Sequence, residues 1–387
     1  MELYTFDKRI KIIRMNLKHN IFSIIFLLCF PLILSAQKIV LGSCTTHDSG
    51  KYKGEMTSGK PNGKGSTIFK NGDVYEGEYV KGKRQGYGIY TFADGEKYEG
   101  EWFQDQQHGK GTYYFSNNNK YVGLWFRDYQ QGHGTMYYYN GDRYDGDWFQ
   151  DQRQGYGVYT FATGAYYKGQ WKNDMKNGKG FFDWGDGTTY SGDWANNQRS
   201  GKGVNYYSDG DVYSGNWLED IQNGKGIYKF KNGDKYEGDY VQGERTGEGI
   251  FTYANGDKYT GHFQESAKDG DGTFIWKNGD IYIGQWKNDL QNGHGKLTKK
   301  MGDIFEGNFK DGHVEGEVII HYADGSKFRG VYHEGKRNGA AIEETKDGKR
   351  WEGTYKDDIR DGKFIEKDRN GQVTGSGVYE GGKRIDD

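Results

Sequence analysis

The sequence predicts an all-β protein, built as an elongated single-layer antiparallel β-meander, or solenoid, of repeated β-hairpins. Three observations carry this prediction. A Tyr-x-Gly-x-aromatic phrase recurs at a constant spacing along most of the chain, as at Tyr52, Tyr75 and Tyr98. Inside each repeat, aromatic or glycine residues alternate with charged or polar ones, which is the pattern of a strand with one wet face. Asn-Gly or Asp-Gly pairs separate the alternating stretches and are typical of hairpin turns.

The repeat is strict in length. Fourteen 23-residue units occupy residues 52–373 without insertion or deletion, and a degenerate terminal unit, or cap, occupies residues 374–387. The units begin at Tyr52, Tyr75, Tyr98, Tyr121, Tyr144, Tyr167, Tyr190, Tyr213, Tyr236, Tyr259, Tyr282, Phe305, Phe328 and Trp351. A glycine follows two residues later in all fourteen. Constant length indicates that each unit packs against the next in one fixed geometry.

One unit supplies two short strands. In "KYEGEW", Tyr98, Gly100 and Trp102 fall on one face and the charged residues on the other. The stretch "GYGIYTF", residues 86–92, alternates in the same way. A three-residue loop over Asp94–Glu96 would place Phe92 opposite Tyr98, Tyr90 opposite Gly100 and Gly88 opposite Trp102, which keeps the faces matched. Each glycine would then leave room for a ring, at about 0.2–1 kcal/mol per cross-strand pair.

The N-terminal segment differs from the repeats. Basic residues precede a 14-residue apolar run, Ile21–Leu34, and small residues follow it. This order is typical of a secretory signal peptide, predicted here as residues 1–36, with Met15 as a second candidate start and cleavage between Ala36 and Gln37. The chain is therefore expected to be exported to the periplasm, the cell surface or the extracellular space. The alternative is a retained membrane anchor at residues 21–34. Residues 37–51 are predicted to be a linker.

Composition excludes several classes of protein. Mean hydropathy is −1.01, but aromatic residues make up 17% of the chain, which argues against disorder. The net charge is −2 with both signs mixed throughout, so no basic field for nucleic acid is present and no nucleic-acid partner is expected. Removal of the signal would take Cys29 and leave Cys44 alone, so the mature chain could form no internal disulfide.

The repeat phrases, such as "YEGEWFQDQQHGKGTYYF" and "YSGNWLEDIQNGKGIYKFKNGDKY", closely resemble MORN (membrane occupation and recognition nexus) repeats. The resemblance extends through the chain after the signal. It implies a β-hairpin solenoid that serves as a platform for binding or assembly, with links in the family to membranes, phosphoinositides and self-association. The pattern changes toward the C-terminus, where the second glycine of Gly-x-Gly becomes Val318, Ala341 and Phe364. Those units are expected to be less regular.

No catalytic residue, cofactor site or metal site is predicted. The Gly-x-Gly pairs lie inside strands and lack the strand–turn–helix context of a nucleotide site. His133 and His294 have no ligand partner at metal spacing. Aspartates recur near the hairpin turns and raise the question of calcium, but they match no calcium loop, and turn chemistry explains them better. They are Asp73, Asp142, Asp211, Asp234, Asp257, Asp280 and Asp303.

The leading functional hypothesis is a non-enzymatic scaffold that presents its extended repeat surface to a protein partner or to itself at the cell envelope. The alternative is a binder of membrane lipid, through phosphoinositide or other anionic headgroups, or of glycan. A spacer rod with no ligand is a third reading. The candidate face for binding or packing consists of the aromatic residues Tyr98, Trp102, Tyr121, Trp125, Tyr144, Trp148, Tyr167, Trp171, Tyr190, Trp194, Tyr213 and Trp217. A simpler interpretation is that these rings only pack on adjacent strands.

Overall fold

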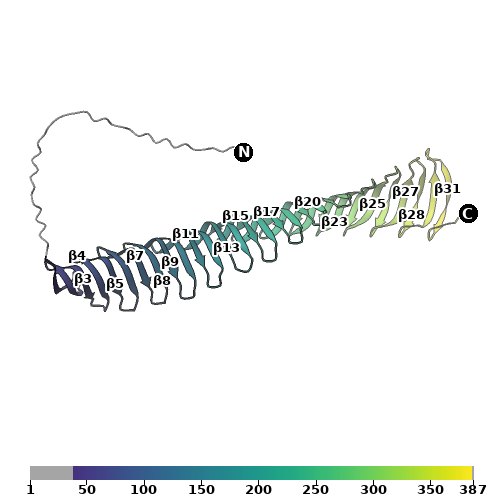
Figure 1. The fold of residues 1–387 in the computed structure, drawn as a ribbon. Helices are drawn as coiled ribbons and strands as arrows, with labels where there is room; N and C mark the ends of the chain where they lie inside the picture. Colours follow the sequence, from purple (N-terminus) through teal and green to yellow (C-terminus); the bar gives the residue numbers. More distant parts are fainter. Residues whose placement is uncertain (1–37, 386–387) are drawn as a thin grey trace, which may run out of the picture.

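The computed structural model describes residues 38–385, and these form one long rod of β-strands with no helix among them. Figure 1 shows the strands following one another along the rod in chain order. The predicted signal peptide and its cleavage site at Ala36 and Gln37 lie outside the described residues. Within residues 38–385, no helix is long and apolar enough to cross a bilayer.

Thirteen of the fourteen repeat units contribute a seven-residue strand followed by a nine-residue strand, and the last unit shares only the seven-residue strand. The seven-residue strands are β2 (Lys51–Thr57), β4 (Val74–Val80), β6 (Lys97–Phe103), β8 (Lys120–Phe126), β10 (Arg143–Phe149), β12 (Tyr166–Lys172), β14 (Thr189–Ala195), β16 (Val212–Leu218), β18 (Lys235–Val241), β20 (Lys258–Gln264), β22 (Ile281–Lys287), β24 (Ile304–Lys310), β26 (Lys327–His333) and β28 (Arg350–Lys356). The nine-residue strands are β3 (Lys60–Ile68), β5 (Lys83–Thr91), β7 (Gln106–Tyr114), β9 (Tyr129–Tyr137), β11 (Gln152–Thr160), β13 (Met175–Asp183), β15 (Gln198–Tyr206), β17 (Ile221–Lys229), β19 (Glu244–Thr252), β21 (Ala267–Ile275), β23 (Leu290–Thr298), β25 (His313–His321) and β27 (Lys336–Glu344).

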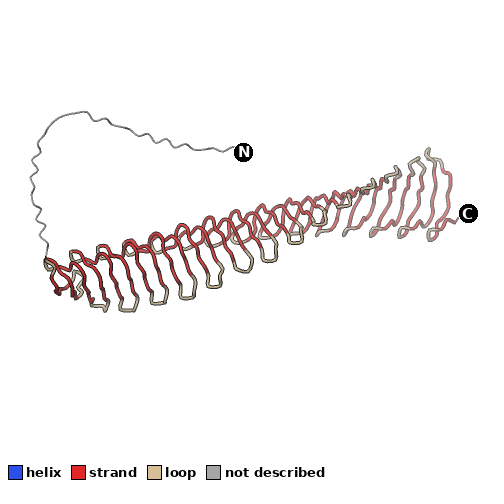
Figure 2. Tube along the Cα trace, viewed as in Figure 1, coloured by secondary structure: helices blue, strands red, loops and turns tan. Residues whose placement is uncertain are grey.

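All described strands belong to one 32-stranded antiparallel sheet, in which each hairpin pairs with the next. The predicted all-β meander is confirmed, and loops alternate along both long edges of the sheet (Figure 2). The sheet begins earlier than the sequence suggested. β1 (Val40–Thr45) pairs in register with β2, so the stretch predicted as a linker contains a strand, and Cys44 lies opposite Tyr52.

The predicted hairpin register is wrong by two residues. Tyr90 pairs with Tyr98, and Gly88 pairs with Gly100. The loop between them does contain three residues, but they are 93–95: the amide of Phe92 bonds the carbonyl of Glu96 at 2.9 Å, and Gly95 adopts a φ of 93°. A three-residue hairpin loop places its left-handed residue last, and glycine tolerates that φ, so Gly95 fixes the loop. A shift of two leaves every side chain on its predicted face.

The two glycines of Gly-x-Gly have different roles, seen in the Tyr167 unit. Gly178 lies at a bulge, where the register shifts between Gly169 and Trp171, and its φ is 75°. Gly180 pairs with Gly169 on one side and Gly192 on the other, within a row of glycines that crosses most of the sheet. The first glycine therefore supplies a backbone conformation, and the second supplies space.

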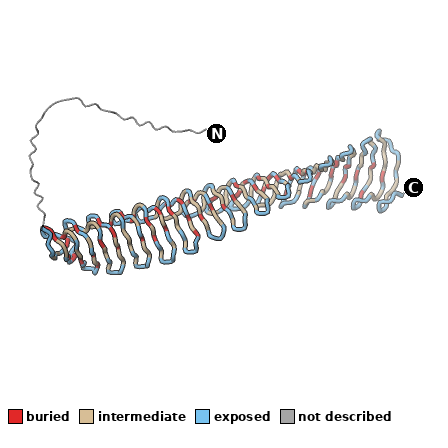
Figure 3. Tube along the Cα trace, viewed as in Figure 1, coloured by how far each residue is buried: buried red, intermediate tan, exposed pale blue. Residues whose placement is uncertain are grey.

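The core is a strip of buried residues along the middle of the strands (Figure 3). Most of these residues are aromatic. The ring of each unit's first tyrosine covers the glycine pair of its own hairpin. Its hydroxyl reaches the bulge, as in Tyr167, which donates to the carbonyl of Gln170 at 2.9 Å. The Gln170 side chain in turn accepts the Lys179 amide at 3.0 Å. The predicted placement of rings over glycines is thus present, although the ring comes from a residue two positions along the same strand.

The C-terminal units stay regular farther along the chain than predicted. β25 and β27 are full nine-residue strands although they carry Val318 and Ala341 in place of the second glycine. Irregularity begins only in the Trp351 unit, whose second strand is split. The last elements are β29 (Ile359–Arg360), β30 (Gly362–Lys367), β31 (Val373–Glu380) and β32 (Lys383–Ile385). The buried residues from Val318 onward form a separate core cluster.

Candidate functional site

The twelve predicted aromatic residues lie together in one column on one face of the sheet, called here the ring face. Each tyrosine ring from Tyr98 to Tyr190 is held between two tryptophans, and Tyr213 lies between Trp217 and Tyr240. Tyr98 meets Trp102 of its own unit at 5.2 Å and Trp125 of the next unit at 5.3 Å, with interplanar angles of 90° and 82°. The same alternation continues to Trp217. Edge-to-face pairs of this kind contribute about 0.5–1.5 kcal/mol each beyond area burial.

The column is interior. Its tyrosines are 0% exposed and its tryptophans 4–6% exposed, although the sheet has a single layer. A second set of rings on the same face, including Tyr113 and Phe115, packs against them. The rings therefore act as the core of the rod, and a ligand could not stack on them without displacing other side chains.

A row of cationic residues, which was not singled out from the sequence, covers four of the six tryptophans in the column. The guanidinium carbon of Arg153 lies 4.4 Å from the centre of the Trp171 ring. Arg153 also donates from Nε to a carboxylate oxygen of Asp174 at 3.0 Å and from Nη2 to the Asp174 carbonyl at 2.9 Å. Cation–π contacts contribute about 0.5–2 kcal/mol. The sequence does contain a signal for this row, because Arg or Lys recurs at the same position in many of the repeat units.

The loop aspartates join consecutive units. Asp142 accepts the amide of Ala162 at 2.8 Å and the hydroxyl of Tyr159 at 2.7 Å, both from the next unit. Asp211 does the same with Lys231 and Tyr228. Each carboxylate therefore ties one hairpin loop to the next. Among residues 38–385, no group of three or more His, Cys, Asp or Glu side chains is placed to hold a metal ion.

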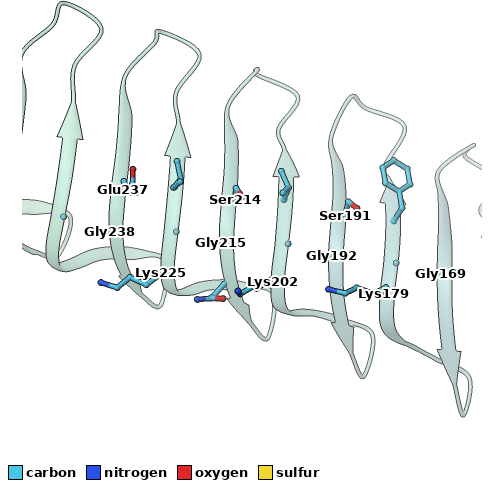
Figure 4. Close-up of a pocket in the computed structure, with 18 of the residues that line it drawn as sticks. Gly169, Lys179, Ser191, Gly192, Lys202, Ser214, Gly215, Lys225, Glu237 and Gly238 are labelled. Atoms are coloured by element: carbon cyan, nitrogen blue, oxygen red, sulfur yellow. The ribbon is translucent and has the colours of Figure 1, made fainter. Parts of the chain in front are cut away.

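The opposite side of the sheet, called here the open face, carries a long groove that the sequence did not predict. It has a volume of about 1380 Å³ and extends from Tyr156 on β11 to Thr260 on β20. The backbone of the glycine row forms its floor. In Figure 4, Lys179, Lys202 and Lys225 lie on one side of this row, with Ser191 and Ser214 on the other.

The two sides of the groove differ in chemistry. Phe181, Val204, Ile227 and Ile250 occupy the same position in four successive units and form an apolar row. Ser191, Ser214 and Glu237 stand between them on the intervening strands. Lys179, Lys202 and Lys225 share one position in successive units and form the other side. Their charges are partly neutralised, because Lys179 pairs with Asp193 at 2.6 Å and Lys225 with Asp239 at 2.7 Å. Lys168 lies opposite Phe181, on the side of the apolar row. Such a groove suits an extended ligand with both apolar and polar groups.

Comparison with known family models shows which family the chain belongs to. The sequence model of the MORN repeat matches eleven consecutive times, at 52–74, 75–97, 98–120, 121–143, 144–166, 167–189, 190–212, 213–235, 236–258, 259–281 and 282–304. These matches cover well over half of the chain. The protein belongs to the MORN-repeat family. The three further units counted from the sequence, from Phe305 to residue 373, continue the same hairpins in the structure, although the family match ends at residue 304.

Solved structures show only remote likeness to this MORN-repeat protein. The TCP domain of SAS-4 from Drosophila melanogaster, in complex with a proline-rich motif of Ana2, is 14% identical, with a TM-score of 0.29 over 46% of this chain and 90% of that chain. The TCP10 domain of CPAP from Danio rerio is 15% identical, with a TM-score of 0.27 over 50% of this chain and 96% of that chain. No match was found among curated proteins.

Proposed function

We propose that this MORN-repeat protein is a non-enzymatic binding scaffold, which holds an extended segment of a protein partner, or of a second copy of itself, in the open-face groove at the cell envelope. The groove carries the proposal. It combines an apolar row, a polar row and a backbone floor over ten consecutive strands, from β11 to β20. A partner segment lying along it would contact several units at once, which matches the unbroken repeat.

A substitution that fills the groove tests the proposal. Ser191 and Ser214 line the groove and are exposed, so Ser191→Trp with Ser214→Trp would obstruct it while leaving the ring column unchanged. Ser208→Trp, in an exposed loop outside the groove, is the matched control. Cross-linking in the native envelope fraction should recover the same partner with the wild type and Ser208→Trp, and lose it with the double variant. Equal recovery by all three would contradict the proposal.

Self-association needs a separate measurement. Light scattering of the purified wild type over a range of concentrations should show a mass increase if the partner is a second copy. The groove-filled variant should then remain monomeric at the same concentrations. A mass increase that survives in this variant would place self-association elsewhere on the rod, and the open ends of the sheet are the next surface to test.

Anionic lipid is the second candidate ligand, because four lysines, Lys168, Lys179, Lys202 and Lys225, line one groove. Each basic residue near an anionic membrane contributes about 1 kcal/mol. The ion pairs to Asp193 and Asp239 offset part of this, which favours the protein partner. Flotation with vesicles containing phosphatidylserine or a phosphoinositide separates the two functions, and pull-down on insoluble glycan tests the remaining alternative.

Export is part of the proposal, since a function at the envelope requires it. We infer a mature N-terminus at Gln37 from the order of basic, apolar and small residues in the sequence. Mass spectrometry of the native protein should find that terminus. Peptides that include intact Lys18–Ser35 would instead indicate the retained anchor.

A further inference from the structure

The cationic row on the ring face follows a rule that links three positions. In the units that begin at Tyr75 through Phe328, an Arg or Lys nine residues after the first aromatic covers a ring of the next unit, which usually also has an Asp or Asn at its hairpin turn. Arg84 covers Trp102 beside Asp105, and Arg199 covers Trp217 beside Asp220. Where the residue at this position is neutral, the next unit usually has no tryptophan at the ring position and has glycine at its hairpin turn. Gln222 and Gln291 are followed by Tyr240 with Gly243 and by Phe309 with Gly312.

Two neighbouring units break the rule. Gln107 and Gln130 occupy the cationic position, yet Trp125 with Asp128 and Trp148 with Asp151 are present in the units that follow. Asp128 and Asp151 accept only the backbone amides of Gln107 and Gln130, each at 2.8 Å. Within residues 38–385, neither carboxylate has a cationic partner, and both aspartates are exposed.

These groups line a pocket of about 680 Å³ on the ring face. Trp125 and Trp148 contribute rings, Asp128, Asp151 and Asp174 contribute carboxylates, and Arg153 is the one cation in its lining. Arg153 is already paired with Asp174. Apart from the Arg153–Asp174 pair, the charged groups of the pocket are the carboxylates of Asp128 and Asp151, and aromatic rings surround them. In the rest of the column, the corresponding place is filled by a guanidinium or an ammonium of the chain itself.

We propose that this pocket binds two arginine side chains of an extended basic segment in a partner protein. The contacts of Arg153 and Arg199 serve as the internal template. In both, the guanidinium lies over a tryptophan, at 4.4 and 4.2 Å, and donates to an aspartate's carboxylate and carbonyl. Arginine fits better than lysine, because its planar fork reaches both acceptors while stacking on the ring.

Spacing restricts the sequence of the partner segment. The two tryptophans lie on strands that are two apart in the sheet, so their separation is about 9.6 Å at about 4.8 Å per strand. Three residues of a polyproline II helix advance about 9.3 Å and return to the same side. A segment with the pattern Arg-x-x-Arg in this conformation would therefore place one guanidinium over Trp125 and the other over Trp148. Binding would displace the buried side chains of Gln107 and Gln130, which line the pocket beside these rings. This site lies on the opposite face from the groove and does not depend on it.

The experiment uses the mature chain and a fluorescent, terminally blocked peptide with Arg-Pro-Pro-Arg at its centre. Gln107→Arg with Gln130→Arg supplies the chain's own cations, as Arg84 and Arg153 do, and should weaken peptide binding at least tenfold by anisotropy. The fold should survive, because the same position carries arginine in other units. Gln222→Arg with Gln291→Arg is the matched control, where no aspartate is present, and should bind the peptide as the wild type does.

Peptide controls complete the test. Replacing both arginines with glutamine, or placing them adjacent, should reduce binding at least tenfold. The groove-filled variant, Ser191→Trp with Ser214→Trp, should bind the peptide normally, and this separates the pocket from the groove. Equal binding by the wild type and by Gln107→Arg with Gln130→Arg would overturn the proposal, as would equal binding of the arginine and glutamine peptides.

Discussion

Gly169 and Tyr167 lie on the same strand, and the hydroxyl of Tyr167 closes over the glycine, so that a Cβ built on Gly169 would lie 2.6 Å from it. The same Cβ would lie 2.5 Å from the Cα of Gly180 across the hairpin and 2.7 Å from the carbonyl oxygen of Lys179. Backbone atoms cannot move aside as a flexible side chain can. This contact explains why glycine occupies the row in every unit that begins with tyrosine.

Gly169→Val should therefore destabilise the rod by about 1–3 kcal/mol or more, because overpacking strains rings and backbone together. Gly375→Val is the matched control, since a Cβ there meets the flexible end of the Glu366 side chain. Urea unfolding followed by tryptophan fluorescence should give a clearly lower midpoint for the first variant alone. Equal midpoints would show that the ring does not require the glycine.

The C-terminal units indicate how ring and glycine depend on each other. Phe305 and Phe328 lack the hydroxyl, and the strands they pair with carry Val318 and Ala341 instead of glycine. We expect the same coupling in a central unit. Gly180→Ala places a methyl against the Tyr167 hydroxyl, so Tyr167→Phe should recover part of the loss. Residues in direct contact couple, so the double variant should be more stable than additivity predicts by about 0.5 kcal/mol or more. Strict additivity in urea unfolding would contradict this.

The sequence was sufficient for the period, the strands and the faces, because alternation and turn residues are local signals. It was not sufficient for the register. Loops over residues 93–95 and 94–96 are equally long and keep the same faces, and only the positive φ of Gly95 distinguishes them. The strand β1 was missed because Val40–Thr45 lacks the repeat phrase, and it pairs through backbone bonds that any sequence can form.

The site was harder to predict than the fold, because its contacts join residues of different units. The twelve aromatic residues share one face of the sheet, but sequence alone cannot show that the rings of successive units bury one another. The Arg153–Asp174 contact likewise joins two units, and the groove depends on which rows flank the glycines across ten strands. Comparing the same position in successive units, as Gln107 with Arg84, gives the missing signal.

The inter-unit carboxylates predict loss of stability in acid. Burial pushes the pKa of Asp142 upward, but hydrogen bonds from Tyr159, Ala162 and Asn140 outweigh it and hold the pKa below its ordinary value of 3.8. A depressed carboxyl pKa adds stability above the unfolded pKa, and this is lost as pH falls through the folded pKa. The melting temperature should therefore fall below about pH 4.

Asp142→Asn isolates one of these contacts. The amide oxygen can still accept the Ala162 amide, but it carries no charge, so the variant should be less stable than the wild type at pH 7 and approach it at pH 3. Thermal melts across this range measure the difference. A gap that stays constant with pH would show that the charge of Asp142 makes no contribution.

The tyrosine column predicts loss of stability in alkali as well. Burial raises the pKa of Tyr282 to about 12, and burial also raises the pKa of Tyr167. The sign follows from linkage: an unfolded tyrosine ionises near pH 10, whereas the folded one stays neutral, so stability is full below about pH 10 and declines above it. Absorbance at the tyrosinate band should show the buried tyrosines ionising only as the tryptophan signal reports unfolding.

Tyr282→Phe tests this linkage at one position of the column. The substitution removes one ionisable group together with its hydrogen bond to the Gln285 carbonyl. Loss of that bond should cost about 1 kcal/mol at neutral pH. Above about pH 10, the free energy of unfolding of the variant should fall less steeply with pH than that of the wild type, because the variant has one tyrosine fewer to ionise on unfolding. Urea unfolding at a series of pH values measures both slopes. Parallel pH profiles for the two proteins would mean that Tyr282 ionises as easily in the rod as in the unfolded chain.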